Sequence, residues 1–283
     1  MRPLLTLLGC ELFCGEAKKA LNPAIGLELF HNFTLLHDDI MDNAPVRRGR
    51  KTVHVKWNSN TAILSGDAML AIALDFMTRV DDNLLRGVLE EFNKVVFEVC
   101  EGQQYDMDFE STDRVSMSDY IEMIRLKTAV LPASCLKIGA MIGGASGVEQ
   151  ENIYKFGENI GLAFQLKDDL LDTFGRQAKF GKRTGGDILA NKKTWLFVKA
   201  MELASESQRQ KLQKAYFSQP TDPEKKIKEV KAIFQQLDLE RVGLLQMKEF
   251  YAKANENLAA INVPEELKKN LVLLSDELLN REL

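Results

Sequence analysis

Residues 33–42, FTLLHDDIMD, and residues 163–172, AFQLKDDLLD, each set three aspartates into strongly apolar sequence. Around both stretches, and nearly everywhere else, apolar residues recur at steps of three and four, which is the period of a helix. Only seven prolines interrupt the 283 residues. The sequence therefore predicts an all-α protein folded as a single domain over residues 1–283.

The same period gives the expected positions of the helices. Ser118 is the expected N-cap of the helix that begins DYIEMI, while Pro223 and Pro264 suit first helical turns. Residues 52–56, TVHVK, are the best strand candidate but are too short and isolated to make a sheet. Helices are expected at residues 4–18, 24–43, 60–80, 84–108, 118–143, 149–174, 188–202, 206–217, 224–236, 239–260 and 264–281.

Composition excludes several classes of protein. The chain has 37 basic and 41 acidic side chains and a formal net charge of -4, which argues against a general nucleic-acid binder. No apolar run approaches the ~18 residues of a transmembrane segment, and no signal peptide is recognisable. The few cysteines suggest a reducing compartment, the cytoplasm, and favour packing roles over a metal pair. They are Cys10, Cys14, Cys100 and Cys135.

The aspartates indicate a metal site. The i, i+4 spacing places Asp38 with Asp42, and Asp168 with Asp172, on one face of a helix. Two carboxylates ~4 Å apart repel by roughly 4 kcal/mol at an effective dielectric of 20, so such clusters require cations. Oxygen-only ligands favour Mg²⁺, which commonly bridges to phosphates. The alternative is that each cluster is a solvated acidic edge of a helix, and the presence of a second cluster weakens this reading. An EF-hand is excluded because neither cluster continues as a calcium-binding loop.

Basic residues follow both clusters, Arg47 and Arg48 after the first and Lys182 and Lys192 after the second. Cations beside metal-binding carboxylates suit a diphosphate ligand, because they can bind the diphosphate oxygens that do not coordinate the metal. A solvated basic loop is the alternative reading. A P-loop is rejected because the segment from Gly175 has the wrong spacing and follows a helix.

Two further features favour a ligand site inside the helices. Gly161 and Gln165 lie at four-residue steps on the face that continues to Asp168, which indicates either tight packing or room for a ligand. Pro132 cannot donate to the carbonyl of Thr128. Carbonyl and hydroxyl dipoles beside Lys127 are thus available to stabilise positive charge on a bound carbon, with a simple kink as the alternative.

Residues 30–49, FHNFTLLHDDIMDNAPVRRG, and 161–175, GLAFQLKDDLLDTFG, are the specific motifs by which the chain resembles the trans-isoprenyl diphosphate synthases, or polyprenyl synthetases. The resemblance implies an isoprenoid-synthase helical bundle around a central cavity, usually a homodimer. It also implies a prenyltransferase that joins isopentenyl diphosphate to an allylic diphosphate such as dimethylallyl, geranyl or farnesyl diphosphate. Released diphosphate is expected to take the proton.

The resemblance also assigns residues. Metal ions, commonly three Mg²⁺, are expected on Asp38, Asp39, Asp42, Asp168, Asp169 and Asp172. The allylic diphosphate is expected to contact Arg47, Lys127, Lys182 and Lys192. The isopentenyl diphosphate site resembles Arg2, His31 and Arg48. Residues around the allylic carbon match Lys127, Thr128 and Gln165.

Product length depends in this family on side chains upstream of the first cluster. Phe30, Phe33 and Thr34 lie eight, five and four residues before Asp38, a pattern that resembles synthases of C20 rather than C15 products. Geranylgeranyl diphosphate is the expected product, with farnesyl diphosphate as the alternative. Simple core packing of the two phenylalanines remains open.

One departure and three rival functions accompany the resemblance. Family members usually carry Gly-Gly-Lys-Arg-x-Arg-Pro where this chain starts at Met1, so a preceding helix and a substrate-binding lysine are expected outside the sequence. The rivals are a catalytically silent regulatory subunit of the same fold, a terpene cyclase and a structural helical metal protein. Complete clusters argue against the first, and the paired acid and basic pattern against the second.

Overall fold

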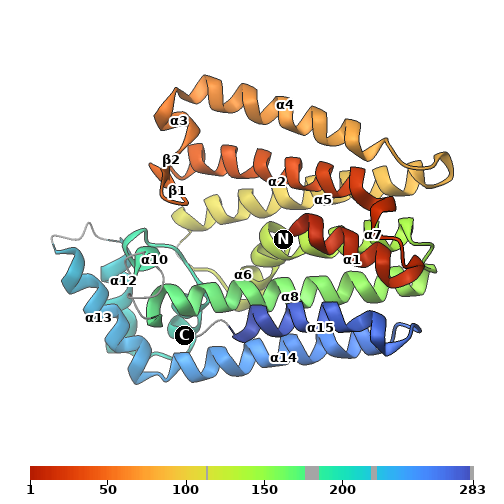
Figure 1. Ribbon diagram of the computed structural model, residues 1–283. Coiled ribbons are helices and arrows are strands. Elements are labelled where there is room, and N and C mark those ends of the chain that lie inside the picture. Colours follow the sequence, from red (N-terminus) through yellow and green to blue (C-terminus); the bar gives the residue numbers. More distant parts are fainter. Residues whose placement is uncertain (113, 176–184, 218–221, 281–283) are drawn as a thin grey trace. The chain divides into compact units, whose positions relative to one another are not determined.

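The structure is a computed structural model and describes residues 1–112, 114–175, 185–217 and 222–280. Most of the described chain is helical (Figure 1), and its strands are only two residues long, so the predicted all-α fold is confirmed. The elements from the N-terminus to the middle of the chain are α1 (Arg2–Cys14), η1 (Ala17–Ala20), α2 (Leu21–Met41), β1 (Val46–Arg47), β2 (Arg50–Lys51), α3 (Val53–Lys56), α4 (Ser59–Met77), α5 (Asp82–Ser111), α6 (Met117–Ile124), η2 (Arg125–Ala129) and α7 (Val130–Ile142). They are followed by α8 (Gly147–Phe174), α10 (Gly186–Leu189), α11 (Trp195–Leu203), α12 (Glu206–Phe217), α13 (Pro223–Gln236), α14 (Leu239–Ala259) and α15 (Glu265–Asn280).

The helices form two compact units, each assembled from separate stretches of chain. Unit 1 comprises residues 1–95, 134–154 and 261–268, and unit 2 comprises residues 96–133, 155–260 and 269–283. Helices α5, α7, α8 and α15 contribute residues to both. The first aspartate cluster belongs to unit 1 and the second to unit 2.

Unit 1 is organised by the packing of α2 along α4, which run side by side in Figure 1. Ala73 of α4 is buried, and a Cβ on Gly26 of α2 would lie 2.9 Å from its carbonyl oxygen. Phe30 of α2 is fully buried and meets Phe92 of α5 edge-on, with ring centroids 5.6 Å apart. These contacts fix the helix that carries the first cluster.

The apolar and largely exposed character of α4 was not predicted from the sequence. Among the described residues, α4 alone has the length and apolar composition of a membrane-crossing helix, with 22% of its apolar window buried. The sequence analysis overlooked this stretch because Asp67 and Asp75 interrupt it. Carboxylates inside a lipid-exposed helix are costly, so protein contact explains such a helix better than lipid contact does.

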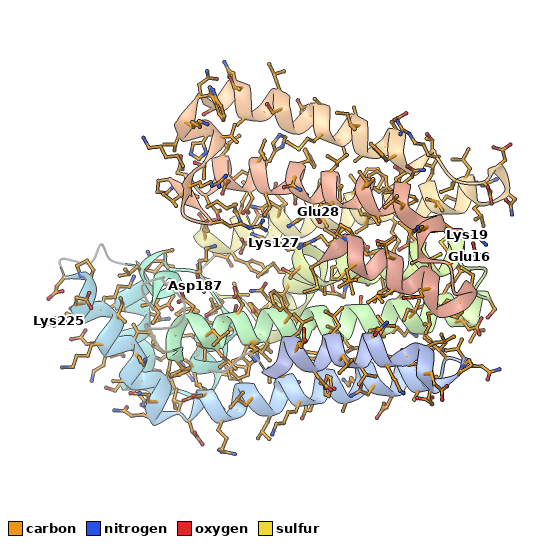
Figure 2. The ribbon with its side chains drawn as sticks, viewed as in Figure 1. Glu16, Lys19, Glu28, Lys127, Asp187 and Lys225 are labelled. Carbon is orange, nitrogen blue, oxygen red and sulfur yellow. The ribbon has the colours of Figure 1, made fainter. Side chains whose placement is uncertain are left out.

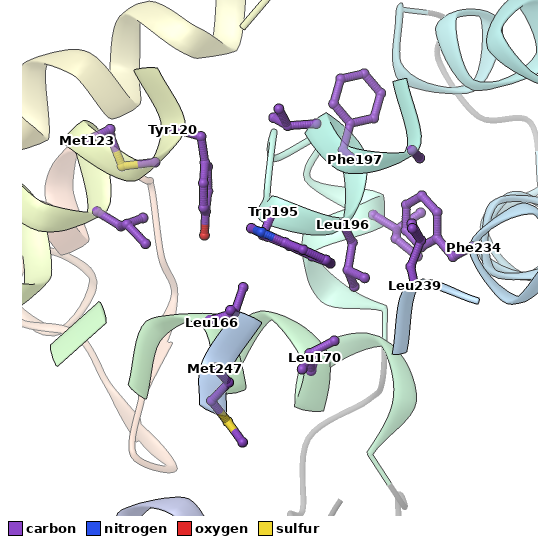
Figure 3. Close-up of a cluster of buried hydrophobic side chains, with 14 of the residues drawn as sticks. Tyr120, Met123, Leu166, Leu170, Trp195, Leu196, Phe197, Phe234, Leu239 and Met247 are labelled. Carbon is purple, nitrogen blue, oxygen red and sulfur yellow. The ribbon is translucent and has the colours of Figure 1, made fainter. Parts of the chain in front are cut away.

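Unit 2 is built around the fully buried indole of Trp195, the first residue of α11 (Figure 3). Leu166 and Leu170 of α8, Phe234 of α13 and Met247 of α14 belong to the same apolar cluster. Each such side chain contributes about 1.5–3 kcal/mol when it is fully buried. The cluster therefore fixes α8, which carries the second aspartate cluster, against α11.

Several helix boundaries differ from the predictions. The helix predicted at residues 118–143 is divided by the π-helical turn η2, and the one predicted at 188–202 is divided between α10 and α11. The N-cap of α6 is Ser116 rather than Ser118, because Ser116 and Asp119 form a reciprocal capping box. Pro223 begins α13 as predicted.

The prediction that residues 52–56 do not make a sheet is confirmed. Residues 53–56 form the short helix α3, and the only described strands are the two-residue pair β1 and β2 just before it. Arg48 and Gly49 connect these strands with φ values of 52° and 74°. Two consecutive residues with positive φ form the tight hairpin turn that matches the twist of antiparallel strands.

Candidate active site

The first aspartate cluster lies at the C-terminal end of α2, where the helix dipole disfavours negative charge. Arg47 of the hairpin compensates this charge. Its Nε donates to Asp39 Oδ1 at 2.7 Å, and its terminal nitrogen donates to Asp38 Oδ2 at 2.8 Å. Asp39 is only 6% exposed, whereas Asp42 is exposed. The hairpin therefore places one cation on two of the three carboxylates.

The second cluster, on α8, repeats this division between buried and exposed carboxylates. Asp169 is 3% exposed, while its neighbour Asp168 is exposed. Asp169 Oδ2 accepts hydrogen bonds from the Tyr120 hydroxyl at 2.5 Å and from the backbone N–H of Trp195 at 2.9 Å. Burial raises the pKa of Asp169 to about 6, against the opposing effect of these hydrogen bonds. In both units the middle aspartate is held by the protein.

A chain of hydrogen bonds links the second cluster to the residues expected around the allylic carbon. The Thr128 hydroxyl donates to Gln165 Oε1 at 3.1 Å, and Gln165 Nε2 donates to Asp169 Oδ1 at 3.0 Å. Lys127 Nζ lies 2.5 Å from Asp106 Oδ2 of α5. The structure thus brings Thr128 and Gln165 together and anchors them on a buried carboxylate.

Asp187 on α10 is an acidic residue that the sequence analysis missed. Its backbone N–H donates to Asp172 Oδ2 at 3.1 Å. Burial first, and then the charges of Asp172 and Asp169, raise the pKa of Asp187 to about 7. The only sequence signal was the pair of glycines before it, at positions 185 and 186, in a region read as the approach to a long helix. Figure 2 labels Asp187 in this part of unit 2.

The two expected basic residues after the second cluster have different outcomes. Lys182 lies outside the described residues. Lys192 follows α10, its backbone N–H donates to the carbonyl of Asp187 at 2.9 Å, and its charge opposes the rise in the pKa of Asp187. Its neighbour Lys193 is buried and donates to the backbone carbonyls of Phe109 and Glu110 instead. Of these two expected residues, Lys192 is thus the one that the structure describes, and it lies beside Asp187.

The structure brings together three residues of unit 1 that were expected at one substrate site, Arg2, His31 and Arg48. The two arginines lie close enough to His31 to influence its pKa. Burial first, then the charges of Arg2, Arg48 and Arg47, lower the pKa of His31 to about 3. Within the described chain, Arg2 Nε is buried without a hydrogen-bond acceptor. Several cations and an unsatisfied donor beside a neutral imidazole are the kinds of group that bind an anion.

The neutral state of His31 predicts how stability depends on pH. Unfolded His31 takes up a proton below about pH 6.5, whereas the folded protein excludes that proton down to about pH 3. Stability should therefore fall as pH drops through this window, by about 2–3 kcal/mol at pH 4.5. His31→Gln should lose less Tm than wild type between pH 7 and pH 4.5, as measured by differential scanning calorimetry. Identical losses in both proteins would contradict the assignment.

The residues expected to set product length are packed in unit 1. Phe30 is fully buried, and Phe33 is 9% exposed with its ring 4.6 Å from that of His37. The Thr34 hydroxyl donates to the carbonyl of His31 at 2.9 Å, which satisfies this polar group within its own helix. Both phenylalanines have fixed partners, so their rings are held in place.

Comparison with known proteins places the chain in a family. Residues 1–235 match the family model described as polyprenyl synthetase. A geranylgeranyl diphosphate synthase of Methanosarcina mazei is 40% identical over 204 residues, which cover 71% of this chain and 63% of that enzyme. The aligned part of the chain thus spans less than two thirds of the length of that relative. The chain belongs to the polyprenyl synthetase family.

Solved structures give the same result over a longer alignment. A crystal structure of a geranylgeranyl pyrophosphate synthase is 44% identical and superposes with a TM-score of 0.94, covering all of this chain and 87% of the other. A geranylgeranyl pyrophosphate synthase from Corynebacterium glutamicum, complexed with isoprenyl diphosphate and magnesium, is 27% identical with a TM-score of 0.90. The alignment with the Corynebacterium enzyme covers all of this chain and 86% of the other.

Proposed function

We propose that this protein is a short-chain prenyltransferase that condenses isopentenyl diphosphate with an allylic diphosphate and releases diphosphate. Geranylgeranyl diphosphate is its main product, and farnesyl diphosphate is the alternative. The observation that carries the proposal is the repeated cluster, in which a fixed middle aspartate is flanked by carboxylates spaced i, i+4. Family membership and the named relatives support the same activity.

The donor set of both clusters fits Mg²⁺. All donors are carboxylate oxygens. Among the described residues, no group of three or more His, Cys, Asp or Glu side chains is placed so that it could hold a metal ion by itself, so substrate phosphates would have to complete the coordination. Mg²⁺ usually keeps several waters and binds through a few carboxylates plus substrate phosphates. The complex of the Corynebacterium enzyme with magnesium supports this choice. We assign three ions to the site.

The aspartates then divide by role. Asp38, Asp42, Asp168 and Asp172 are the direct metal ligands. The buried middle residues are Asp39 and Asp169. They contribute to the metal site by holding their helices in the orientation that presents the other carboxylates to the metal. When bound, Mg²⁺ supplies positive charge that stabilises the departing diphosphate.

The remaining steps depend on side chains of the chain itself. Arg47, Lys127, Lys182 and Lys192 bind the allylic diphosphate, and their charges stabilise it as the allylic C–O bond breaks and its electron pair leaves with the diphosphate. Dipoles of Thr128 and Gln165 stabilise the carbon that becomes positive. The fixed hydrogen bonds of these two residues mean that little reorganisation is needed when charge develops.

The second substrate binds at Arg2, His31 and Arg48. Because His31 is neutral, its imidazole can donate a hydrogen bond to a diphosphate oxygen without leaving a buried charge when the site is empty. The double bond of isopentenyl diphosphate attacks the allylic carbon with its π electron pair. A proton then leaves the adjacent carbon for the released diphosphate, which restores neutrality in the product chain.

Product length is set by Phe33, with Phe30 behind it. Phe33→Ala removes a ring with fixed neighbours, so the growing chain gains room and the product should lengthen by at least one C5 unit. The products of isotopically labelled isopentenyl diphosphate, separated by thin-layer chromatography after dephosphorylation, measure this change. Phe217→Ala, on the half-exposed ring of α12, is the matched control and should leave the product unchanged. An unaltered product in Phe33→Ala would assign the ring to core packing alone.

A second copy of the chain covers the exposed side of α4 in this proposal. Leu64 is 69% exposed and Ile72 is 47% exposed, an unusual apolar surface for a protein in water. A homodimer removes this surface from water and explains why α4 is apolar on its outer side. Sedimentation analysis should give twice the 31.9 kDa mass of one chain.

The cytoplasm is the proposed location, since the four cysteines are free thiols, as expected in a reducing compartment.

One assay separates the proposed function from its rivals. The protein is incubated with Mg²⁺, isopentenyl diphosphate and, in turn, dimethylallyl, geranyl and farnesyl diphosphate, and the products are identified by mass spectrometry. Prenyl diphosphates lengthened by C5 units up to C20 are expected. Hydrocarbons would indicate a terpene cyclase, and the absence of turnover would indicate a silent or structural protein.

A further inference from the structure

The helical run from Met117 to Ile142 changes its hydrogen-bond register at η2. Here the N–H of Val130 donates to the carbonyl of Arg125, five residues earlier, instead of four. Such π-helical turns are rare, and they occur frequently at functional sites. Lys127 and Thr128 are the third and fourth residues of this turn. A local structure that is unfavourable by itself needs support from its neighbours.

Glycines of two neighbouring helices supply close backbone contacts to η2. A Cβ on Gly102 of α5 would lie 2.3 Å from the backbone nitrogen of Lys127. A Cβ on Gly161 of α8 would lie 2.6 Å from Cα of Ala129. Both contacts are with backbone atoms, which cannot move aside as a flexible side chain can. Glycine weakens the interior of a long helix, so these two positions have a packing reason.

The same two helices also hold the first residue of the turn. Arg125 lies 3.6 Å from Glu98 of α5, 3.2 Å from Glu158 of α8 and 2.8 Å from Glu122 of α6. Glu98 precedes Gly102 by four residues, and Glu158 precedes Gly161 by three. Each helix therefore presents a carboxylate to the start of η2 and, one turn later, a glycine to its body.

On α5 the arrangement continues for another turn. Asp106 lies four residues after Gly102, and its Oδ2 forms an ion pair with Lys127 Nζ at 2.5 Å. Residues 98, 102 and 106 thus lie on one face of α5 and contact successive parts of η2. The contacts fix the backbone of the turn and the direction of Lys127 together.

We propose that Gly102 and Gly161 are positioning residues for the prenyl transfer, because their missing side chains set where η2 holds Lys127 and Thr128. This inference rests on the proposed function. Arg125 fixes the start of the turn, and the two glycines fix its distance from α5 and α8. An added methyl group at residue 102 forces the turn away from α5, and displacements near 1 Å at a reacting group can cost about 10²-fold in rate.

Gly102→Ala should lower kcat by about 10–100-fold, with the KM for isopentenyl diphosphate changed less than threefold, since its site lies on unit 1 residues. Gly143→Ala is the matched control. A Cβ at this position would lie 2.7 Å from the carbonyl oxygen of Cys10 in α1. The backbone clash is therefore similar, but it involves a helix other than η2. This control should lose thermal stability but keep its kcat when both proteins are assayed well below their Tm values.

A second variant covers the case in which Gly102→Ala does not fold. Arg125→Lys keeps the positive charge but loses the forked contacts to three helices, and it should lower kcat with little change in the same KM. Hydrogen exchange measured by mass spectrometry adds a readout that needs no turnover. The amides of residues 125–130 should exchange faster in either variant than in wild type, and no faster in Gly143→Ala.

The outcomes separate this inference from the proposed function. An active wild type with equal kcat losses in Gly102→Ala and Gly143→Ala would overturn the positioning role and leave the activity intact. An inactive wild type would refute the proposed function, and the exchange data would still decide whether the glycines hold the turn. Unchanged exchange at residues 125–130 in the variants would overturn that part as well.

Discussion

Asp168→Asn should lower kcat by about 10²–10³-fold while changing the Tm by only a few degrees. Asp168 is an exposed carboxylate at the end of α8, so its loss costs the fold little. Asparagine keeps the size of the side chain but removes the negative charge that the proposed Mg²⁺ site requires. Steady-state kinetics with isopentenyl and farnesyl diphosphate, together with calorimetry, measure both effects.

The matched control for Asp168→Asn is Glu151→Gln on the same helix. This exposed carboxylate lies outside both clusters, so its neutralisation should leave kcat within twofold of wild type. If Asp168→Asn also kept the rate of wild type, the metal-binding role of the second cluster would be wrong.

Asp169→Asn should have the opposite signature, a large loss of stability. Asp169 accepts hydrogen bonds from Tyr120, Trp195 and Gln165 in a buried position. The amide nitrogen of asparagine would face one or more of these donors and leave them unsatisfied. The expected cost is about 2–4 kcal/mol, which lowers the Tm by about 3–7 °C for a chain of this size.

Tyr120→Phe is the graded control for that prediction. It removes one donor and leaves the other two hydrogen bonds of Asp169 in place, so the expected loss is about 1 kcal/mol. Urea unfolding followed by circular dichroism gives both values on one scale. A free energy of unfolding for Asp169→Asn equal to that of wild type would contradict the structural role of the middle aspartate.

Much of the fold follows from the sequence because the apolar period is local information. Long helices such as α2, α5 and α8 keep one buried face, and their existence and type were predicted correctly. The breaks within predicted helices depend on distant contacts. The turn η2 depends on Gly102 and Gly161, which lie more than 20 residues away, and α11 begins at Trp195, whose backbone N–H is accepted by Asp169.

The N-cap of α6 shows a different kind of error, because the signal was present. Ser116 and Ser118 are equally good caps by residue type. Only Ser116 has an acidic residue three positions later, and the reciprocal hydrogen bonds with Asp119 select it. The capping-box pattern in the sequence was sufficient to make the correct choice.

The sequence names candidate site residues, but it does not show which of their side chains are buried and which are exposed. The letters DDIMD and DDLLD do not reveal that the second aspartate of each is buried. That burial depends on Arg47 in unit 1, and on Tyr120 and Trp195 in unit 2, 49 and 26 residues from Asp169. Asp187 was missed for the same reason, since only tertiary structure brings it to Asp172.

The central proposal is that both aspartate clusters serve the same prenyl transfer. A double-mutant cycle on kcat with Mg²⁺, isopentenyl diphosphate and farnesyl diphosphate tests it most directly, using Asp38→Asn, Asp168→Asn and the double variant. Residues that act as one catalytic unit show strongly non-additive effects. We predict that the double variant is at most a few fold slower than either single variant. Losses that multiply in the double variant, or a single variant as fast as wild type, would contradict the claim.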